Sequence, residues 1–134
     1  MNFLFVCTGN KYRSPMAEAV AAKKIGGWKN VASAGIGKSA KLLGRAPKRV
    51  VELLASRGYE LPTAWRSRPL DIEVLKWSDV VVCMGPVHKR FVSENFGLLR
   101  RLVVLGVPDP AYKLDTLPGV LDMIEGYVVD LVTR

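Results

Sequence analysis

The residues with the clearest chemical potential lie near the N-terminus, in the stretch FLFVCTGNKYRSPMAE (residues 3–18). Cys7 is followed six positions later by Arg13. A cysteine thiolate is a strong nucleophile, and the planar guanidinium of arginine can bind two oxygens of a phosphate group at once. Because glycine and asparagine let the intervening chain curve tightly, this spacing predicts a loop that holds an oxyanion over a nucleophile.

The elements on either side of the loop must position it. The apolar run Asn2–Val6 predicts a buried strand, and the helical spacing of Ser14–Ile25 predicts a helix. Ser14 is expected to cap this helix, with Glu18 completing a capping box. The free N–H groups and the dipole of a helix start favour anions. They would therefore favour the thiolate form of Cys7 and a phosphate group beside it.

Several residues inside the loop are expected to shape it or to contact a ligand. Gly9 lets the backbone curl around an oxyanion, and Asn10 can take a left-handed conformation and hydrogen-bond to the hydroxyl of Ser14. Lys11 and Tyr12 flank the hollow, where they would add a positive charge and an aromatic face. The phosphate-binding or substrate-binding residues predicted in this loop are Thr8, Gly9, Asn10, Lys11, Tyr12 and Ser14.

Short aliphatic runs alternate with stretches of helical spacing along the chain, which is typical of an α/β protein with a parallel sheet. The predicted strands are Asn2–Val6, Val31–Ser33, Val80–Cys83 and Leu102–Leu105. The predicted helices are Ser14–Ile25, Pro47–Arg57, Leu70–Trp77, Val87–Asn95 and Leu117–Val132. The segment Gly35–Gly44 is expected to be a mobile surface loop. With 134 residues, 49% of them hydrophobic, the chain is predicted to form a single domain over residues 1–134.

Composition argues against several classes of protein. No apolar run approaches the length of a membrane span, and no N-terminal segment has the pattern of a signal peptide, so we expect a cytoplasmic protein with no membrane partner. The formal net charge of +8 favours phosphate-bearing partners. The basic residues form no recognisable nucleic-acid module, so no specific nucleic-acid partner is expected.

Cysteine and histidine usage gives no sign of a metal or cofactor. Cys7 and Cys83 lack the close spacing of zinc ligands. The one histidine, His88, has no evident metal-ligand or catalytic-triad partners. We therefore expect no metal and no cofactor, and we interpret His88 as a helix-surface residue.

The stretch FVCTGNKYRSPMAEA resembles the signature of low-molecular-weight protein tyrosine phosphatases. The resemblance continues along the chain: Ser33-Ala34-Gly35 is similar to the family's Ser-Ala-Gly after the second strand, APKRVVELLASRGYEL to its second helix, and SDVVVCM to its third strand. Asp109-Pro110 resembles the Asp-Pro pair that carries the family's general acid. Together these segments cover nearly the whole chain in order.

This resemblance implies a doubly wound, four-stranded parallel sheet in the order 2-1-3-4, with helices on both faces, and a two-step hydrolysis without metal. It implies that Cys7 is the nucleophile, that Arg13 binds the phosphate and that Asp109 is the general acid. Asp109 also stands after an apolar strand and between two prolines, a rigid setting that can hold a carboxyl group over the hollow. Asp115 is the alternative acid, although its context is more typical of a cap on the last helix.

Three positions depart from the family's usual pattern. Tyr12 stands where many relatives have a second cysteine, so their reversible disulfide is not expected, and Cys83 is interpreted as a packed strand residue. Ala111 replaces the first of two tyrosines after Asp-Pro, whereas Tyr112 keeps the second and is expected to contact the substrate. Trp65 occupies a place where relatives commonly have histidine; we expect it to pack against the core or its edge.

Three functions remain open from the sequence. The leading prediction is hydrolysis of phosphomonoesters, most of all phosphotyrosine in proteins or small aryl phosphates, by a monomer or weak dimer. Phosphoarginine is not distinguished from phosphotyrosine. The second is an arsenate reductase-like enzyme of the same fold, which needs a third redox cysteine where this chain has two cysteines. The third is a basic module that binds phospho-ligands without turnover.

Overall fold

The computed structural model, which describes residues 1–97 and 101–134, contains a sheet of four parallel strands in the order β2-β1-β3-β4. The strands are β1 (Phe3–Cys7), β2 (Val31–Gly35), β3 (Val80–Cys83) and β4 (Leu102–Val104). The predicted order is therefore confirmed. Because β1 pairs with β2 on one side and with β3 on the other, the chain connections diverge at its carboxyl end. Open α/β sheets bind their ligands at such a point.

Strand β1 is buried on both of its faces. The side chains of Phe3, Phe5 and Cys7 belong to one core cluster, and those of Leu4 and Val6 belong to the other. A central strand of a parallel sheet has no solvent-facing side, which explains the continuous apolar run. The strand includes Cys7, so the nucleophile candidate is the last residue of a rigid element and not the first residue of a loop.

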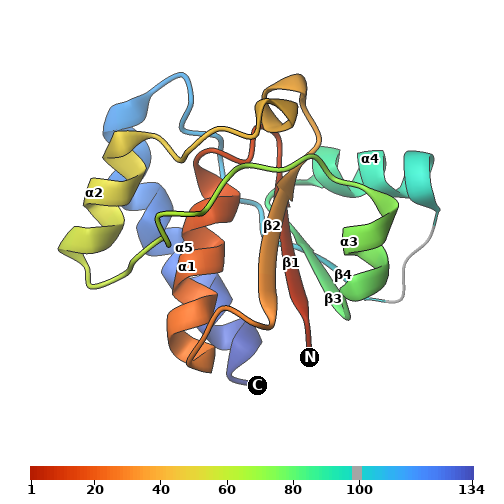
Figure 1. Ribbon diagram of the computed structural model, residues 1–134, viewed down its shortest axis with the longest axis horizontal. Helices are drawn as coiled ribbons and strands as arrows, with labels where there is room; N and C mark the ends of the chain where they lie inside the picture. The colour runs from red at the N-terminus through yellow and green to blue at the C-terminus, as the bar shows by residue number, and fades with distance from the viewer. Residues whose placement is uncertain (98–100) are drawn as a thin grey trace.

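Helices cover both faces of the sheet, as predicted. Figure 1 shows α1, α2 and α5 on one side of the sheet and α3 and α4 on the other. The bounds are α1 (Arg13–Ile25), α2 (Lys48–Ser56), α3 (Ile72–Trp77), α4 (Pro86–Phe96) and α5 (Leu117–Val132), with two 3-10 helices, η1 (Lys38–Leu42) and η2 (Leu114–Thr116). Among these described helices, none has the length and apolar character needed to cross a membrane.

The start of α1 differs from the prediction. The helix begins at Arg13, its N-cap residue is Tyr12, and no side chain caps it. The hydroxyl of Ser14 contacts the sulfur of Cys7 instead, and the carboxylate of Glu18 accepts hydrogen bonds from other elements. The predicted capping box was wrong because both polar side chains turn toward the interior behind the loop.

The segment Gly35–Gly44 is more ordered than a plain surface loop. Its first residue ends β2, and η1 occupies residues 38–42. The N–H of Gly37 donates to the carbonyl oxygen of Thr8 at 2.8 Å. A Cβ atom at Gly35 would lie 2.7 Å from that same oxygen, so only glycine fits there. The segment therefore packs directly on the loop after β1.

Candidate active site

A pocket of about 200 Å³ opens at the carboxyl end of β1. It is lined by Cys7, Thr8, Gly9, Lys11, Tyr12, Arg13, Ser39, Asp109, Ala111 and Tyr112. The loop after β1 and the segment with Asp109 thus meet at one hollow, as predicted, and Ser39 of η1 joins them. Asn10 and Ser14 are also predicted site residues, but they do not line the pocket; both are fully buried beneath it. Ser39 and Ala111 are lining residues that the sequence analysis did not assign.

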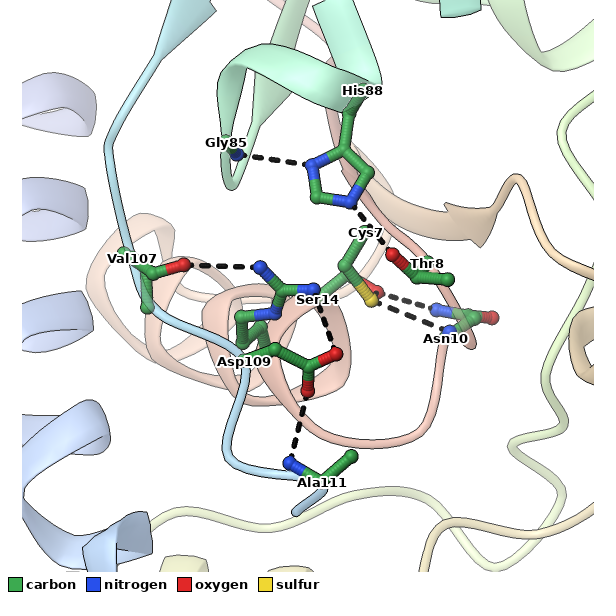
Figure 2. Close-up of polar contacts among 10 residues, drawn as sticks. Cys7, Thr8, Asn10, Ser14, Gly85, His88, Val107, Asp109 and Ala111 are labelled. Atoms are coloured by element: carbon green, nitrogen blue, oxygen red, sulfur yellow. Dashed lines mark hydrogen bonds and ion pairs between the residues drawn. The ribbon is translucent and has the colours of Figure 1, made fainter. Parts of the chain in front are cut away.

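The sulfur of Cys7, a residue that lines this pocket, has two polar neighbours (Figure 2). The hydroxyl oxygen of Ser14 is 2.9 Å from Sγ. The backbone N–H of Asn10 donates to Sγ at 3.3 Å. Cys7 is 2% exposed, so these donors act on the sulfur with little competition from solvent. Hydrogen bonds to the charged form stabilise a thiolate.

The side chain of Asn10 determines which way the proton of Ser14 points. Its Nδ2 group donates to Ser14 Oγ at 2.8 Å and to Ser33 Oγ at 2.9 Å. Since Ser14 Oγ already accepts a hydrogen bond from Asn10, its own hydrogen is available to the sulfur of Cys7. The predicted brace between Asn10 and Ser14 is confirmed, and it aims a hydroxyl donor at the nucleophile candidate.

Three further residues support this arrangement from behind, and the sequence analysis missed their role. Ser33 donates to Glu18 Oε1 at 2.5 Å, and Trp65 Nε1 donates to the same oxygen at 2.9 Å. Burial raises the pKa of Glu18, while these two hydrogen bonds act in the opposite direction. Trp65 therefore anchors Glu18 through its indole N–H. A serine in the otherwise apolar strand β2 was the one local signal that could have indicated this network.

The loop backbone leaves hydrogen-bond donors free. Asn10 has the predicted left-handed conformation, with φ of 54°, and its Oδ1 accepts from the N–H of Arg68 at 2.8 Å. Within the part of the chain that the structure describes, the N–H groups of Gly9, Lys11 and Tyr12 donate to no protein acceptor. Backbone donors of a folded protein are nearly always paired. These N–H groups can therefore bind the oxygens of an anion in the pocket.

Arg13 and Asp109 also line the pocket, and their side chains form an ion pair. Arg13 is 6% exposed, and its Nη1 donates to the carbonyl oxygen of Val107 at 3.0 Å. Its Nη2 is 3.6 Å from Asp109 Oδ2. The other oxygen of Asp109 accepts from the N–H of Ala111 at 3.0 Å. The guanidinium is thus oriented by the segment that carries the carboxylate, which places a cation and an acid at the same hollow.

The rim of the pocket is formed by Lys11 and by two tyrosines, Tyr12 and Tyr112. Lys11 Nζ donates to Ser67 Oγ at 3.0 Å, and burial lowers the pKa of this lysine from its ordinary value. Tyr112 is 97% exposed, so its ring is available to a bound molecule. The predicted positions of these three residues around the hollow are confirmed; their contacts with a substrate remain a prediction.

Asp115, the alternative acid, lies away from this pocket. It belongs to η2 and lines a separate surface depression together with Arg49 and Leu117. The N-cap residue of α5 is Thr116, and no side chain caps that helix. The predicted capping role of Asp115 was therefore wrong, and its position makes Asp109 the better candidate for an acid.

Cys83 is a packed strand residue, as predicted. It is fully buried in β3, and burial raises the pKa of its thiol to about 12. Its side chain belongs to the core cluster on the face of the sheet opposite to that of Cys7. The two thiols are thus separated by the sheet. Among residues 1–97 and 101–134, no group of three or more His, Cys, Asp and Glu side chains is placed to hold a metal ion.

The interpretation of His88 as a helix-surface residue was wrong. The side chain is fully buried in the first turn of α4. Its Nδ1 atom accepts a hydrogen bond from the backbone N–H of Gly85, and its Nε2 atom lies 3.0 Å from Thr8 Oγ1 (Figure 2). The helical spacing around His88 did not show that the turn before α4 folds against the loop after β1.

Acid is expected to destabilise the protein through His88. Burial, with a smaller contribution from the positive charge of Arg13, lowers the pKa of His88 from 6.5 to about 4. Between pH 6.5 and about 4, the unfolded chain binds a proton at His88 that the folded chain does not. The free energy of unfolding is therefore unaffected by His88 well above pH 6.5 and falls as the pH drops toward 4. The loss is about 2–3 kcal/mol between pH 7.5 and 4.5.

Urea unfolding of the parent protein and of His88→Asn at these two pH values measures this effect. The parent should lose more free energy of unfolding than the variant on acidification. Equal losses in the two proteins would contradict the assignment of this acid sensitivity to His88.

Comparison with known proteins agrees with the geometry. The profile of the family described as "Low molecular weight phosphotyrosine protein phosphatase" matches residues 2–134. The protein-arginine-phosphatase of Bacillus subtilis is 39% identical over 103 residues, which are 75% of this chain and 66% of that protein. The low molecular weight protein-tyrosine-phosphatase PtpB of Staphylococcus epidermidis is 30% identical over 128 residues, covering 93% of this chain and 87% of that protein.

A solved structure of the arginine phosphatase YwlE, a mutant with a phosphorylated active site serine, superposes with a TM-score of 0.84 at 31% identity. The superposition covers 99% of this chain and 94% of that chain. The family match spans nearly the whole sequence, and the cysteine, arginine and aspartate that carried the resemblance line one pocket. The chain therefore belongs to the low molecular weight phosphotyrosine protein phosphatase family, a family of cysteine-dependent phosphomonoester hydrolases.

Proposed function

We propose that this protein removes the phosphoryl group from phosphotyrosine in proteins, with Cys7 as nucleophile, Arg13 as the phosphate-binding cation and Asp109 as general acid. The observation that carries the proposal is the single pocket lined by these three residues. Behind the sulfur, Ser14 and Asn10 provide the hydrogen bonds that favour a thiolate. The phosphorylated serine of the related YwlE mutant supports a covalent phosphoenzyme by analogy.

In the first step, the thiolate of Cys7 attacks phosphorus in line with the leaving oxygen. An S–P bond forms while the P–O bond to the tyrosine side chain breaks, and Asp109 gives its proton to the departing oxygen. The guanidinium of Arg13 and the free N–H groups of the loop hold the other three phosphoryl oxygens. Because these donors are already in place, little reorganisation is needed as negative charge shifts among those oxygens.

In the second step, water attacks the phosphocysteine. Asp109, now a carboxylate, accepts a proton from that water, the S–P bond breaks, and inorganic phosphate leaves. The electron pair of the broken bond returns to sulfur, where the hydroxyl of Ser14 and the N–H of Asn10 stabilise the thiolate. The cycle consumes one water molecule and needs no external reductant. A reducing compartment keeps such a thiol active, so we propose that the enzyme works in the cytoplasm.

The rim of the pocket favours phosphotyrosine over phosphoarginine. The rings of Tyr12 and Tyr112 can pack on the phenyl ring of phosphotyrosine. Lys11 lines the same pocket as Arg13 and adds a second positive charge near it, with its ammonium group donating to Ser67. A phosphoarginine substrate would bring its own guanidinium next to the phosphorus, where like charges repel. Phosphotyrosine has a neutral phenyl ring at the same place, so it meets no such repulsion.

Phosphoarginine is the second candidate substrate, and two observations favour it. The Bacillus subtilis relative with 39% identity is a protein-arginine-phosphatase. The alignment with it covers 66% of that protein, so the comparison does not carry its substrate to this chain. The replacement of a tyrosine by Ala111 beside Asp109 also leaves one aromatic wall of the pocket absent.

Replacement of Lys11 by methionine tests this substrate assignment. The parent should hydrolyse a phosphotyrosine peptide with a higher kcat/KM than the matched phosphoarginine peptide. Lys11→Met should raise the phosphoarginine to phosphotyrosine ratio of kcat/KM by about tenfold, the effect of removing one nearby like charge in a partly screened site. Phosphate release from both peptides gives the ratio.

Lys76→Met, on α3 and outside the pocket, is the matched control. Its ratio of the two kcat/KM values should equal that of the parent. A parent that prefers phosphoarginine would overturn the substrate proposal. If the parent turned over neither peptide but bound both, the protein would be a phospho-ligand binding module instead.

The arsenate reductase alternative is less consistent with the fold. A relay of that kind needs redox cysteines that can reach one another, and this chain has two cysteines in total. Cys7 and Cys83 are buried on opposite faces of the sheet. A disulfide between them would require the sheet to be disrupted.

A further inference from the structure

His88 is a buried polar residue that the proposed reaction does not use. It is fully buried, at the N-terminal end of α4 and away from the solvent-facing side of that helix. Both ring nitrogens have partners from the described chain: the backbone of Gly85 and the side chain of Thr8. Burying a histidine costs free energy unless its polar atoms are satisfied. The role of His88 therefore follows from its hydrogen bonds with Gly85 and Thr8.

The hydrogen bond from Gly85 determines the tautomer of the ring. The backbone N–H of Gly85 donates to Nδ1 at 3.0 Å, so Nδ1 carries no proton. The low pKa of about 4 keeps the imidazole neutral at physiological pH. A neutral ring has one N–H group, which must be Nε2–H. His88 is thus the donor in the 3.0 Å contact with Thr8 Oγ1.

Thr8 is the residue directly after the nucleophile, and both branches of its side chain are held. Its Oγ1 accepts from His88, and its methyl group faces Gly37, where an added Cβ would lie 3.2 Å from Thr8 Cγ2. The same glycine donates its N–H to the carbonyl oxygen of Thr8 at 2.8 Å. A β-branched side chain held at both branches keeps one rotamer. Thr8 also lines the pocket.

The hydroxyl of Thr8 has one proton of its own. Because Oγ1 accepts from His88 Nε2–H, that proton points away from the imidazole. Thr8 is an exposed residue that lines the pocket, so this proton can be donated to an oxyanion bound there. We propose that His88 is a positioning residue: it makes the Thr8 hydroxyl a donor to a phosphoryl oxygen in the pocket. This inference rests on the proposed function of the site.

A donor held in advance is more effective than a rotating hydroxyl. The phosphoryl oxygens require donors throughout the transfer, and a group that is already oriented costs no reorganisation when the reaction occurs. Without His88, the hydroxyl of Thr8 can rotate and the first residue of the loop loses one anchor. The expected consequence is weaker binding of tetrahedral and trigonal-bipyramidal oxyanions together with a lower kcat.

Two amide variants separate this role from the contribution of His88 to the helix start. In His88→Asn, Oδ1 falls near the position of Nδ1, so it can still accept from Gly85, but the donor to Thr8 is lost. In His88→Gln, the amide nitrogen falls near the position of Nε2, so the donor to Thr8 is kept. A residue that only closes the first turn of α4 would tolerate asparagine better than glutamine; a positioning residue would show the opposite order.

The measurements are kcat and KM for p-nitrophenyl phosphate and the inhibition constant of orthovanadate, at pH 7. His88→Asn should lower kcat/KM about tenfold and weaken orthovanadate inhibition by a similar factor, the effect of losing one hydrogen bond to a charged group. His88→Gln should lose clearly less than His88→Asn in both quantities. Thr8→Val should reproduce the losses of His88→Asn, and Thr8→Ser should lose less than Thr8→Val.

The double variant His88→Asn/Thr8→Val should be no worse than either single change, because both remove the same hydrogen bond. Losses that multiply, or a His88→Asn protein as active as His88→Gln, would overturn the inference. If His88→Asn does not fold, the comparison of Thr8→Val with Thr8→Ser tests the inference instead. Equal activity of these two variants would overturn the inference. A parent without turnover would contradict the proposed function alone, since orthovanadate affinity measured by calorimetry still compares the variants.

Discussion

Cys7→Ser should have almost no turnover. We expect kcat for p-nitrophenyl phosphate to fall by about four orders of magnitude or more, because a serine hydroxyl is scarcely ionised at neutral pH and is a poor nucleophile without a base. Serine also makes the second step harder, since an alkoxide leaves phosphorus less readily than a thiolate. The assay is the initial rate in a buffer that contains a chelator. Calorimetry with inorganic phosphate should still detect binding, because Arg13 and the loop N–H groups remain.

Cys83→Ala is the matched control for the loss of a buried thiol. Cys83 lies in β3, on the opposite face of the sheet, and is outside the pocket. Its removal leaves a cavity, so the variant should unfold at a lower urea concentration while its rate per folded molecule stays close to that of the parent. Measurable turnover by Cys7→Ser at a rate near that of the parent would contradict the nucleophile assignment. Equal inactivation of both variants would also contradict it.

The loop between β1 and α1 could be predicted because its functional residues are consecutive in the sequence. The left-handed conformation of Asn10 and its contact with Ser14 depend on neighbours within a few positions. The strand before the loop was also clear, since a continuous apolar run is typical of a central parallel strand. The strand order came from the family resemblance, because hydrophobic spacing does not show which strands are neighbours.

The buried position of His88 and the partners of Glu18 depend on residues that lie far away along the chain. His88 is 80 positions from Thr8, and Trp65 is 47 positions from Glu18. Local patterns explained each of them without these partners: a histidine in a helical stretch resembles a surface residue, and Ser14 with Glu18 resembles a capping box. Tertiary contacts overrode these local preferences. Polar residues within apolar segments, such as Ser33 in β2, indicate that such contacts exist but not which residue makes them.

Asp109→Asn should lower kcat strongly, and by an amount that depends on the leaving group. Asparagine keeps Oδ1, so the hydrogen bond from the N–H of Ala111 can persist and the loop should hold its shape. It cannot donate an acidic proton. General acid catalysis contributes about 10²- to 10⁴-fold when the leaving oxygen is basic. We therefore expect kcat for phenyl phosphate, whose phenol resembles the tyrosine side chain, to fall by about 10²- to 10³-fold.

With p-nitrophenyl phosphate, whose phenol is far more acidic, the fall should be only about tenfold, because that phenolate leaves readily without a proton. KM should change little, because Arg13 and the loop amides still bind the phosphate. The loss of the carboxylate 3.6 Å from Arg13 removes a negative charge and so does not weaken phosphate binding. Asp115→Asn, in η2 and outside the pocket, is the control and should behave as the parent with both substrates. Equal falls with the two substrates would show that Asp109 acts on the charge of Arg13 and not as a proton donor. Loss in Asp115→Asn with retention in Asp109→Asn would move the acid to Asp115.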